Sequence, residues 1–206
     1  YVKGNWSYIG GIWGYTKGTV IKNSKNKGTI SGNRYTGGIV GTTNGTVENC
    51  VNEGNVVSTA GYAGGIASEI TTSATITNCI NTANIESKTG LMIGGIVGYA
   101  NGSADSSVNN CISLGKVSSA ATGDTLGSII GSITRGKVTN CYGVSKDKVV
   151  CGKVNATYAT VTDSYASDDC NEVLYKYATG KDLNDCSEDA KNEIVEITSK
   201  YAQLLM

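Results

Sequence analysis

TITNCINTANI, residues 75–85, is the stretch that decides the fold, because near-copies of it stand before and after it in the chain. The upstream copy is TVENCVNEGNV, residues 46–56, and the downstream copy is SVNNCISLGKV, residues 107–117. In each copy an apolar second residue is followed by Asn-Cys and, nine residues after itself, by an Ile or Val. Recurrence at about 30 residues is typical of a stacked repeat protein.

Three short blocks recur in fixed order along most of the chain. The first is Gly-Gly-Ile, with copies at Gly10-Gly11-Ile12, Gly37-Gly38-Ile39, Gly64-Gly65-Ile66, Gly94-Gly95-Ile96 and, altered, Gly127-Ser128-Ile129. The second is an apolar residue, any residue, Asn or Asp, then Cys or Ser, and its apolar anchors are Ile21, Val47, Ile76, Val108, Val138 and Val161. The third contributes Ile30, Val56, Ile85 and Val117. The spacing varies only in the connections between blocks, where insertions are tolerated.

Each block has the composition of a short strand, rich in Ile and Val and bounded by Gly or Asn. Such a strand cannot bury its apolar side alone, whereas like strands of successive units can stack into sheets. The sequence therefore predicts an all-β fold, a parallel β-helix of about five to six coils with three short strands per coil, over residues 1–165. A sandwich of antiparallel hairpins is the alternative, but it would give alternate strands different surroundings.

Composition and charge argue against several classes of function. The 206 residues include 17 basic and 17 acidic side chains, so no excess of basic charge is available to replace the counterions of a nucleic acid. No apolar run approaches the ~18 residues of a membrane span, so we expect no membrane insertion. The chain contains no His, which removes the commonest general base and every Ser-His or Cys-His nucleophile pair.

The repeated segments resemble the GLUG repeat of bacterial surface proteins, which is named for a Gly-apolar-apolar-Gly core. That core reads Gly11-Ile12-Trp13-Gly14, Gly38-Ile39-Val40-Gly41 and Gly95-Ile96-Val97-Gly98, and the xNCxNxGxV segment that follows is also typical of the family. The resemblance covers about residues 1–165, with one glycine lost in each of Gly65-Ile66-Ala67-Ser68 and Ser128-Ile129-Ile130-Gly131. It implies an adhesin-like bacterial protein that is secreted or displayed on the cell surface.

GLUG repeats also occur beside the protease domain of some IgA-specific metallopeptidases, where they are accessory. The His-Glu-x-x-His metal motif is missing from this chain, so the resemblance implies no peptidase activity here.

The two ends of the chain differ from the repeat. Val2-Lys3-Gly4-Asn5 matches Ile30-Ser31-Gly32-Asn33, so the chain begins on a third strand and we expect it to be part of a longer array. Residues 166–206 do not match the repeat and are expected to form a C-terminal cap. Acidic residues after Ser187 and apolar residues at helical spacing predict a helix over about residues 187–205. The beginning of a further domain is the alternative.

A cysteine recurs at the same place in four units, as Cys50, Cys79, Cys111 and Cys141. Equivalent positions of a β-helix stack at about 4.8 Å, so this column would span about 14 Å, whereas zinc needs its sulfurs about 2.3 Å from one point. Side chains that point in parallel are poor geometry for a disulfide, and no positive charge recurs beside the thiols to activate them. Because Ser24 and Ser164 take the same position, we interpret the column as a structural ladder.

The Asn before each Cys or Ser forms a second column, Asn23, Asn49, Asn78, Asn110 and Asn140. Asn tolerates left-handed backbone and its amide can hydrogen-bond along a stack, so we expect a turn there rather than a ligand site.

Three cysteines lie outside the column, Cys151, Cys170 and Cys186. Cys170 and Cys186 are the pair that we favour for a disulfide, but sequence alone does not choose among the three. An acidic group consists of Asp163, Asp168, Asp169 and Glu172. It is a candidate Ca²⁺ site because Ca²⁺ prefers oxygen ligands, and a solvated loop is the more ordinary interpretation. We predict no other cofactor.

Aromatic residues near the Gly-Gly-Ile blocks are the candidates for ligand binding. They are Trp6, Tyr8, Trp13, Tyr35, Tyr62 and Tyr99, with Tyr15 close by in the sequence. On an outer face such rings can stack on sugars or pack against a partner protein, and the alternative is an aromatic ladder that only stabilises the β-helix. The segments before each Gly-Gly-Ile would form one edge and are the predicted variable recognition surface, residues 31–36, 57–63, 86–93 and 118–126.

These observations predict a non-catalytic, extracellular β-helical module that acts in adhesion, through a host or bacterial surface glycan or protein, or as a spacer. The alternative is a polysaccharide-active lyase or glycoside hydrolase, which needs convergent carboxylates. The carboxylates of the early repeats sit at unmatched positions, Glu48, Glu53, Glu69 and Glu86. Ice binding by a Thr array is a third option, but Val20, Ser107 and Lys137 interrupt the column of Thr46, Thr75 and Thr160.

Overall fold

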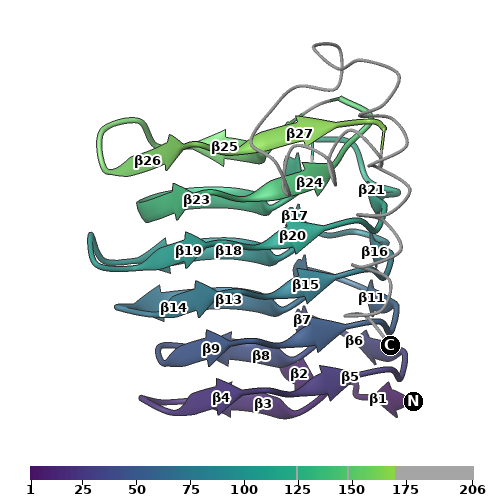
Figure 1. Cartoon of the computed structure of the whole chain (residues 1–206). Coiled ribbons are helices and arrows are strands. Elements are labelled where there is room, and N and C mark those ends of the chain that lie inside the picture. The colour runs from purple at the N-terminus through teal and green to yellow at the C-terminus, as the bar shows by residue number, and fades with distance from the viewer. Residues whose placement is uncertain (124, 148, 170–206) are drawn as a thin grey trace, which may run out of the picture.

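The computed structural model describes residues 1–123, 125–147 and 149–169. These residues form 27 strands and no helix. Neighbouring strands pair in parallel, and they stack coil upon coil along one axis (Figure 1). The fold is a parallel β-helix, which confirms the predicted fold class and excludes antiparallel hairpins for this part of the chain.

The strands form five ladders, A to E, in the order in which a coil visits them. Ladder A contains β1 (Val2–Lys3), β6 (Ile30–Gly32), β11 (Val56–Ser58), β16 (Ile85–Ser87) and β21 (Val117–Ser119). Ladder B contains β2 (Tyr8–Gly10), β7 (Tyr35–Gly37), β12 (Tyr62–Gly64), β17 (Met92–Gly94) and β22 (Thr125–Gly127). Ladder C contains β3 (Trp13–Thr16), β8 (Val40–Thr43), β13 (Ala67–Thr72), β18 (Val97–Gly102), the first part of β23 (Ile130–Thr139) and β25 (Cys151–Val154).

Ladder D contains β4 (Val20–Lys22), β9 (Thr46–Glu48), β14 (Thr75–Thr77), β19 (Ser107–Asn109), the second part of β23 and β26 (Ala159–Thr162). Ladder E contains β5 (Lys25–Asn26), β10 (Val51–Asn52), β15 (Ile80–Asn81), β20 (Ile112–Ser113), β24 (Tyr142–Val144) and β27 (Tyr165–Ser167). Because β23 runs through ladders C and D, these two ladders form one 11-stranded sheet. The first coil runs from β1 to β5, and the fifth from β21 to β24.

Each of the first four coils carries five short strands where the sequence pattern predicts three. The Gly-Gly-Ile block spans the break between ladders B and C, since β7 ends at Gly37 and β8 begins at Val40. The second block spans the break between ladders D and E, where Asn49 has a left-handed φ of 53° between β9 and β10. The recurring blocks therefore mark corners of the coil as well as strands.

The register joins the apolar anchors found in the sequence. In ladder D, Val47 pairs with Ile76, and Ile76 pairs with Val108. In ladder A, Val56 pairs with Ile85. All five side chains are buried. The constant nine-residue spacing thus sets which side chains enter the core, as the pattern predicts.

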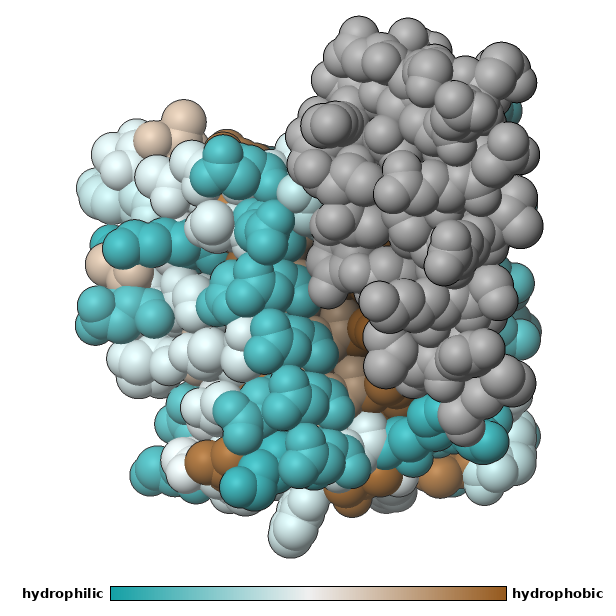
Figure 2. Space-filling model, viewed as in Figure 1, coloured by the Kyte–Doolittle hydropathy of each residue, from teal (hydrophilic) through white to brown (hydrophobic). Residues whose placement is uncertain are grey.

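The interior is a continuous apolar column. Its largest cluster joins ladders C, D and the corners beside them, and it includes the stacked Ile39, Ile66, Ile96 and Ile129. A smaller cluster joins ladders A and B through Val56, Ala63, Ile85 and Ile93. Burial of each Ile or Val side chain contributes about 1.5–3 kcal/mol. The outer face over ladder D is largely hydrophilic, whereas apolar surface shows over ladder E (Figure 2), where Ile112 and Tyr142 form a third cluster with Ile80 and Tyr165.

The last coil takes a shorter path than the others. After β24 the chain passes through residues 145–150 directly to β25 in ladder C, so ladders A and B end at β21 and β22 within the described residues. A hollow of about 640 Å³ lies beyond these two strands, beside residues 144–147 and 149. Among the described residues, the missing part of the coil accounts for this hollow.

The repeat extends to Ser167, the last residue of β27. The predicted helix over residues 187–205 lies outside the described residues, as does nearly all of the predicted cap over residues 166–206. Within the described ranges, no helix is long and apolar enough to cross a membrane.

Candidate functional site

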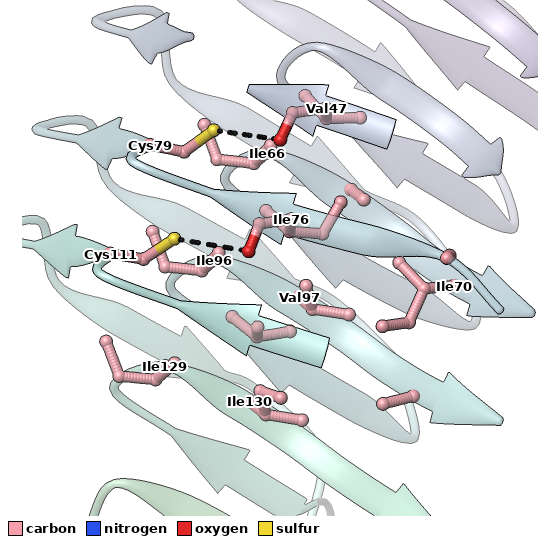
Figure 3. Close-up of a cluster of buried hydrophobic side chains, with 14 of the residues drawn as sticks. Val47, Ile66, Ile70, Ile76, Cys79, Ile96, Val97, Cys111, Ile129 and Ile130 are labelled. Atoms are coloured by element: carbon pink, nitrogen blue, oxygen red, sulfur yellow. Dashed lines mark hydrogen bonds between the residues drawn. The ribbon is translucent and has the colours of Figure 1, made fainter. Parts of the chain in front are cut away.

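The cysteine column lies at the corner between ladders D and E and is fully buried; its members are Cys50, Cys79, Cys111 and Cys141. Each thiol donates to the carbonyl oxygen two residues earlier, as from Cys79 Sγ to Thr77 at 3.2 Å. A longer contact reaches the preceding coil, from Cys79 Sγ to the carbonyl oxygen of Val47 at 3.6 Å (Figure 3). The thiols therefore join each corner to the ladder D strand of the preceding coil.

Ser24 and Ser164 make the same bond at the two ends of this column. Ser24 Oγ donates to the Lys22 carbonyl oxygen at 2.9 Å, and Ser164 Oγ donates to that of Thr162 at 2.8 Å. Both serines are half-buried, whereas the four cysteines are fully buried. A thiol is less costly than a hydroxyl to bury in apolar surroundings. The change from Ser to Cys follows the burial of the position.

The described cysteines are free thiols, and Cys111 and Cys151 lie in surroundings that disfavour the thiolate, whereas hydrogen bonds with Cys111 and Cys50 lower the pKa of Cys79. Burial raises the pKa of Cys111, and burial raises the pKa of Cys151 to about 12. A nucleophile or a metal ligand needs the opposite shift. No group of three or more His, Cys, Asp or Glu within the described ranges is placed to hold a metal ion. The predicted Cys170–Cys186 disulfide lies outside these ranges.

The asparagine before each Cys or Ser adopts the left-handed conformation that the sequence predicts. The φ angles of Asn23, Asn49, Asn78, Asn110 and Asn140 lie between 51° and 53°. Asp163 continues this column with a φ of 50°, so one residue of the candidate calcium group forms a structural turn. Asp168 and Asp169 follow directly after β27, and Glu172 lies outside the described residues.

A second set of asparagines, three residues further along, forms a buried ladder that the sequence analysis does not anticipate. Asn26 Nδ2 donates to Asn52 Oδ1 at 2.7 Å, and Asn52 Nδ2 donates to Asn81 Oδ1 at 2.8 Å. Asn52 Nδ2 also donates to the Gly54 carbonyl oxygen of its own corner at 3.0 Å. Polar side chains are ordinarily expected at the surface. Here the amides of Asn26 and Asn52 are each satisfied by the amide of the next coil, and Asn81 Nδ2 donates to the hydroxyl of Ser113 at 3.4 Å.

The tyrosine strip consists of Tyr8, Tyr15, Tyr35, Tyr62 and Tyr99 on the outside of ladders B and C. In ladder B, Tyr8 pairs with Tyr35 and Tyr35 with Tyr62. Their chain neighbours Thr36 and Ala63 are fully buried, so the alternation of a strand turns the tyrosines outward. Tyr15 and Tyr99 belong to one outward position of ladder C. The strip therefore crosses the first four coils.

The rings of the strip contact one another in sequence. Ring centroids lie 5.5 Å apart for Tyr15 and Tyr8, 5.0 Å for Tyr8 and Tyr35, 5.3 Å for Tyr35 and Tyr62, and 5.2 Å for Tyr62 and Tyr99. Tyr8 and Tyr35 stack with planes 17° apart, whereas the planes of Tyr35 and Tyr62 cross at 75°. Tyr8 is 47% exposed. The stacked pair is thus Tyr8 and Tyr35, and the other contacts of the strip join rings whose planes cross.

Glu69 lies among the crossed rings, at the same outward position of ladder C as Tyr99 and Thr42. It is half-buried, and Thr42 Oγ1 donates to its Oε2 at 3.5 Å. Burial raises the pKa of Glu69. Burial also raises the pKa of Tyr35 and of Tyr62, and the charge of Glu69 adds to both shifts. Because this column changes residue at each coil, repeat counting does not identify Glu69 as part of the site.

The structure does not place Trp13 in the tyrosine strip, where the sequence analysis grouped it with the ligand-binding candidates. Trp13 pairs with Val40, at a position whose later members are fully buried core residues. The pairing of β3 and β8 is interrupted at the intervening Gly14, so Trp13 and Tyr15 do not share a face. Trp6 lies between β1 and β2 and is 84% exposed.

The segments predicted as a variable recognition surface lie at the corner between ladders A and B. Backbone bonds stack them, from Ala60 N to the Asn33 carbonyl oxygen at 2.8 Å and from Ala120 N to that of Ser87 at 3.0 Å. They therefore form one edge, as expected. Arg34 projects from this edge, with Cζ 5.8 Å from the centroid of the Tyr35 ring.

The hollow beyond β21 and β22 is the other concave feature. Its apolar lining includes Val117, Leu126 and Val149, and Lys116 and Asp168 also line it. The described chain ends at Asp169, one position beyond Asp168. The hollow continues the interior columns of ladders A and B, and its lining combines their apolar side chains with serines and with the charged Lys116, Lys146, Asp147 and Asp168.

No family model matches the chain, and neither a curated protein nor a solved structure matches it.

Proposed function

We propose that the chain is a non-catalytic, extracellular binding module of a bacterial surface protein, and that the tyrosine strip binds a glycan. The GLUG-like repeats support the cell-surface setting by resemblance. The observation that carries the binding role is the outward row of five contacting tyrosines over the first four coils. An adhesin needs such a surface, whereas a pure spacer does not.

The chemistry of tyrosine suits a saccharide. A sugar presents an apolar face of C–H groups and a polar edge of hydroxyls, and a tyrosine side chain likewise combines an apolar ring with a polar tip. Aromatic packing contributes about 0.5–1.5 kcal/mol for each pair beyond the burial of area. Several rings in contact with one chain of sugars would therefore add to a useful affinity.

The β-helix supports binding because it holds the rings in place before the ligand arrives. The strands beneath the strip carry fully buried neighbours such as Thr36, Ala63 and Ile93. Each ring also contacts the next, with centroids no more than 5.5 Å apart. Little side-chain freedom then remains to be lost on binding, and this loss is one of the main costs of association.

The alternative, a polysaccharide-active enzyme, needs two acidic groups that flank the bond to be cleaved. Glu69 is the carboxylate within the strip, and the residues in register with it are Thr42 and Tyr99. Neither is acidic, so the geometry around Glu69 favours binding over hydrolysis.

A glycan array probed with the full chain tests the proposal. We expect binding to at least one class of surface glycan, reduced roughly tenfold or more in Tyr35→Ala/Tyr62→Ala. Tyr158→Ala is the matched control, because Tyr158 is 55% exposed and contacts Arg135 outside the strip. Thermal unfolding establishes that each variant is folded. If no glycan binds the folded chain, or if the control loses as much affinity as the double variant, the proposal is wrong.

A further inference from the structure

We propose that Glu69, with the rings of Tyr35, Tyr62 and Tyr99, binds the ammonium group of a positively charged saccharide. This inference rests on the proposed glycan-binding function and adds the chemical class of the ligand. A glycan that carries protonated amino sugars or quaternary ammonium substituents has the required chemistry.

The rings around Glu69 form walls rather than a flat platform. Tyr62 contacts Tyr35 at 5.3 Å with planes 75° apart, and it contacts Tyr99 at 5.2 Å with planes 55° apart. Tyr62 and Glu69 belong to neighbouring strands of the third coil, β12 and β13, and Tyr99 is in register with Glu69 one coil later. Crossed aromatic rings beside a carboxylate match the arrangement that attracts cations to the negative faces of rings.

Glu69 also lacks a positive partner of its own within the described residues. The ion pairs found there join Glu53 to Lys25 at 2.7 Å and, more loosely, to Lys27 at 4.0 Å. Glu69 has Thr42 as its hydrogen-bond donor, at 3.5 Å. A half-buried carboxylate that is not matched by a cation is unfavourable, and a bound ammonium group would supply the missing charge.

The strip already binds one cation from its own chain. The guanidinium carbon of Arg34 lies 5.8 Å from the centre of the Tyr35 ring, which is within the range of a cation–π contact. Arg34 belongs to the corner beside Tyr35 and makes no ion pair with Glu69. The side of the strip nearer to Tyr62 and Tyr99 is where an external cation fits.

A saccharide is favoured over a single basic side chain because the strip continues beyond Glu69. Tyr8 and Tyr35 stack in line with Tyr62 along the axis, so one ring is offered by each of three successive coils. A polymer of repeated sugar units can place its ammonium group at Glu69 while its neighbouring units contact these rings. A lone lysine or choline group would contact the crossed rings only.

The test compares two oligosaccharides that differ only in charge. Isothermal titration of the full chain would use a glucosamine oligomer, which carries protonated amines, and the N-acetylglucosamine oligomer of equal length, which is neutral. We expect the charged oligomer to bind roughly tenfold more tightly. In Glu69→Gln this preference should fall to about twofold or less. Glu53→Gln is the control, because Glu53 lies just after β10 of ladder E and is ion-paired with Lys25. This variant should keep the full preference for the charged oligomer.

The outcomes separate this inference from the proposed function. If both oligomers bind equally and Glu69→Gln changes neither affinity, the ammonium site is wrong while the glycan-binding role stands. If no glycan binds, both are wrong. If choline chloride competes with the charged oligomer for wild type but not for Glu69→Gln, the ammonium site is supported. If a lysine-rich peptide binds tightly through Glu69 and no saccharide binds, the proposed saccharide ligand is wrong. Because Glu69→Gln removes a poorly solvated charge, we expect the variant to fold, and circular dichroism checks this.

Discussion

Ser128 and Gly143 face each other in the fifth coil, and together they invert a pairing that the earlier coils repeat. There the second glycine of Gly-Gly-Ile faces a polar side chain of ladder E, in the pairs Gly38–Asn52, Gly65–Asn81 and Gly95–Ser113. A Cβ on Gly38 would lie 2.4 Å from Cγ of Asn52, and a Cβ on Gly143 would lie 2.5 Å from Cβ of Ser128. Each coil has room for one side chain at this place. In the altered Gly127-Ser128-Ile129 block, the extra side chain of Ser128 is therefore compensated by the glycine at position 143.

This complementarity predicts a strong coupling between the two positions. Gly143→Ser places a side chain against that of Ser128 and should lower the free energy of unfolding by about 1–3 kcal/mol. Adding Ser128→Gly recreates the Gly95–Ser113 pair of the preceding coil and should restore most of the loss. Urea unfolding of the four proteins in a double-mutant cycle measures the coupling, which we expect to exceed about 1 kcal/mol. Additive losses would show that the two side chains do not compete for space.

The cysteine column predicts that serine is the best replacement for Cys79. Serine can donate to the Thr77 carbonyl oxygen as Ser24 and Ser164 do to theirs, so Cys79→Ser should cost about 1–2 kcal/mol. Cys79→Val removes the donor and enlarges the side chain, and it should cost about 2–4 kcal/mol. Urea unfolding ranks the two variants. An equal or larger loss in the serine variant would mean that apolar volume, not the hydrogen bond, decides the residue.

The buried asparagine ladder predicts a large effect at its centre. Asn52→Ala removes one of the two hydrogen bonds of Asn26 Nδ2 and one of the two of Asn81 Oδ1, as well as the bonds of Asn52 itself, which should destabilise the protein by about 2–4 kcal/mol. Asn55→Ala is the control, because Asn55 is exposed and accepts one bond, from Asn84 N at 3.1 Å. That variant should lose less than about 1 kcal/mol. Similar losses in both, measured by thermal unfolding, would argue against a cooperative ladder.

The raised pKa of Glu69 predicts that neutralising this side chain stabilises the protein by an amount that depends on pH. Because burial raises this pKa above its ordinary value of 4.5, the folded state holds the proton more tightly than the unfolded chain. The corresponding stability is present below the ordinary pKa and is lost as pH rises through the folded-state pKa. Glu69→Gln avoids that loss, so it should be more stable than wild type at neutral pH and equal to it in acid.

Urea unfolding across this pH range provides the measurement. The pKa values of Tyr35 and Tyr62 are raised from 10.0, so these two neighbours do not titrate in the same window. Glu53→Gln should behave in the opposite way at neutral pH, since it breaks the ion pair with Lys25. A constant difference between wild type and Glu69→Gln at all pH values would contradict the assignment.

The stacking of coils could be predicted because the same residue types return at the same spacing. Val47, Ile76 and Val108 specify one position of ladder D, and no other register buries all of them. The left-handed turn could be predicted from Asn78 and its equivalents, because few other residues tolerate that conformation. The number of strands per coil could not be predicted, because the corners at Gly-Gly and Asn-Cys divide what looks like one strand in the sequence.

The candidate site was harder to predict because it depends on positions that change from coil to coil. Tyr15, Thr42, Glu69 and Tyr99 occupy one outward position of ladder C and share no chemical type. Tyr8, Tyr35 and Tyr62 could be identified by counting from Gly-Gly-Ile. Trp13 was grouped with them because it lies close in sequence to the same block, but its register partner is the buried Val40, so it does not belong to the tyrosine strip.

The parallel ladders have a mechanical consequence for a protein that is anchored at one end. The hydrogen bonds between coils run along the axis, from Ile30 N to the Asn55 carbonyl oxygen in the second and third coils and from Ile85 N to that of Lys116 further along. A pull on the two termini would open these bonds in succession, one coil after another, instead of shearing a whole sheet at once. Each coil of about 30 residues would release roughly 100 Å of extended chain. The molecule would yield to tension in small steps and could rewind when the load falls.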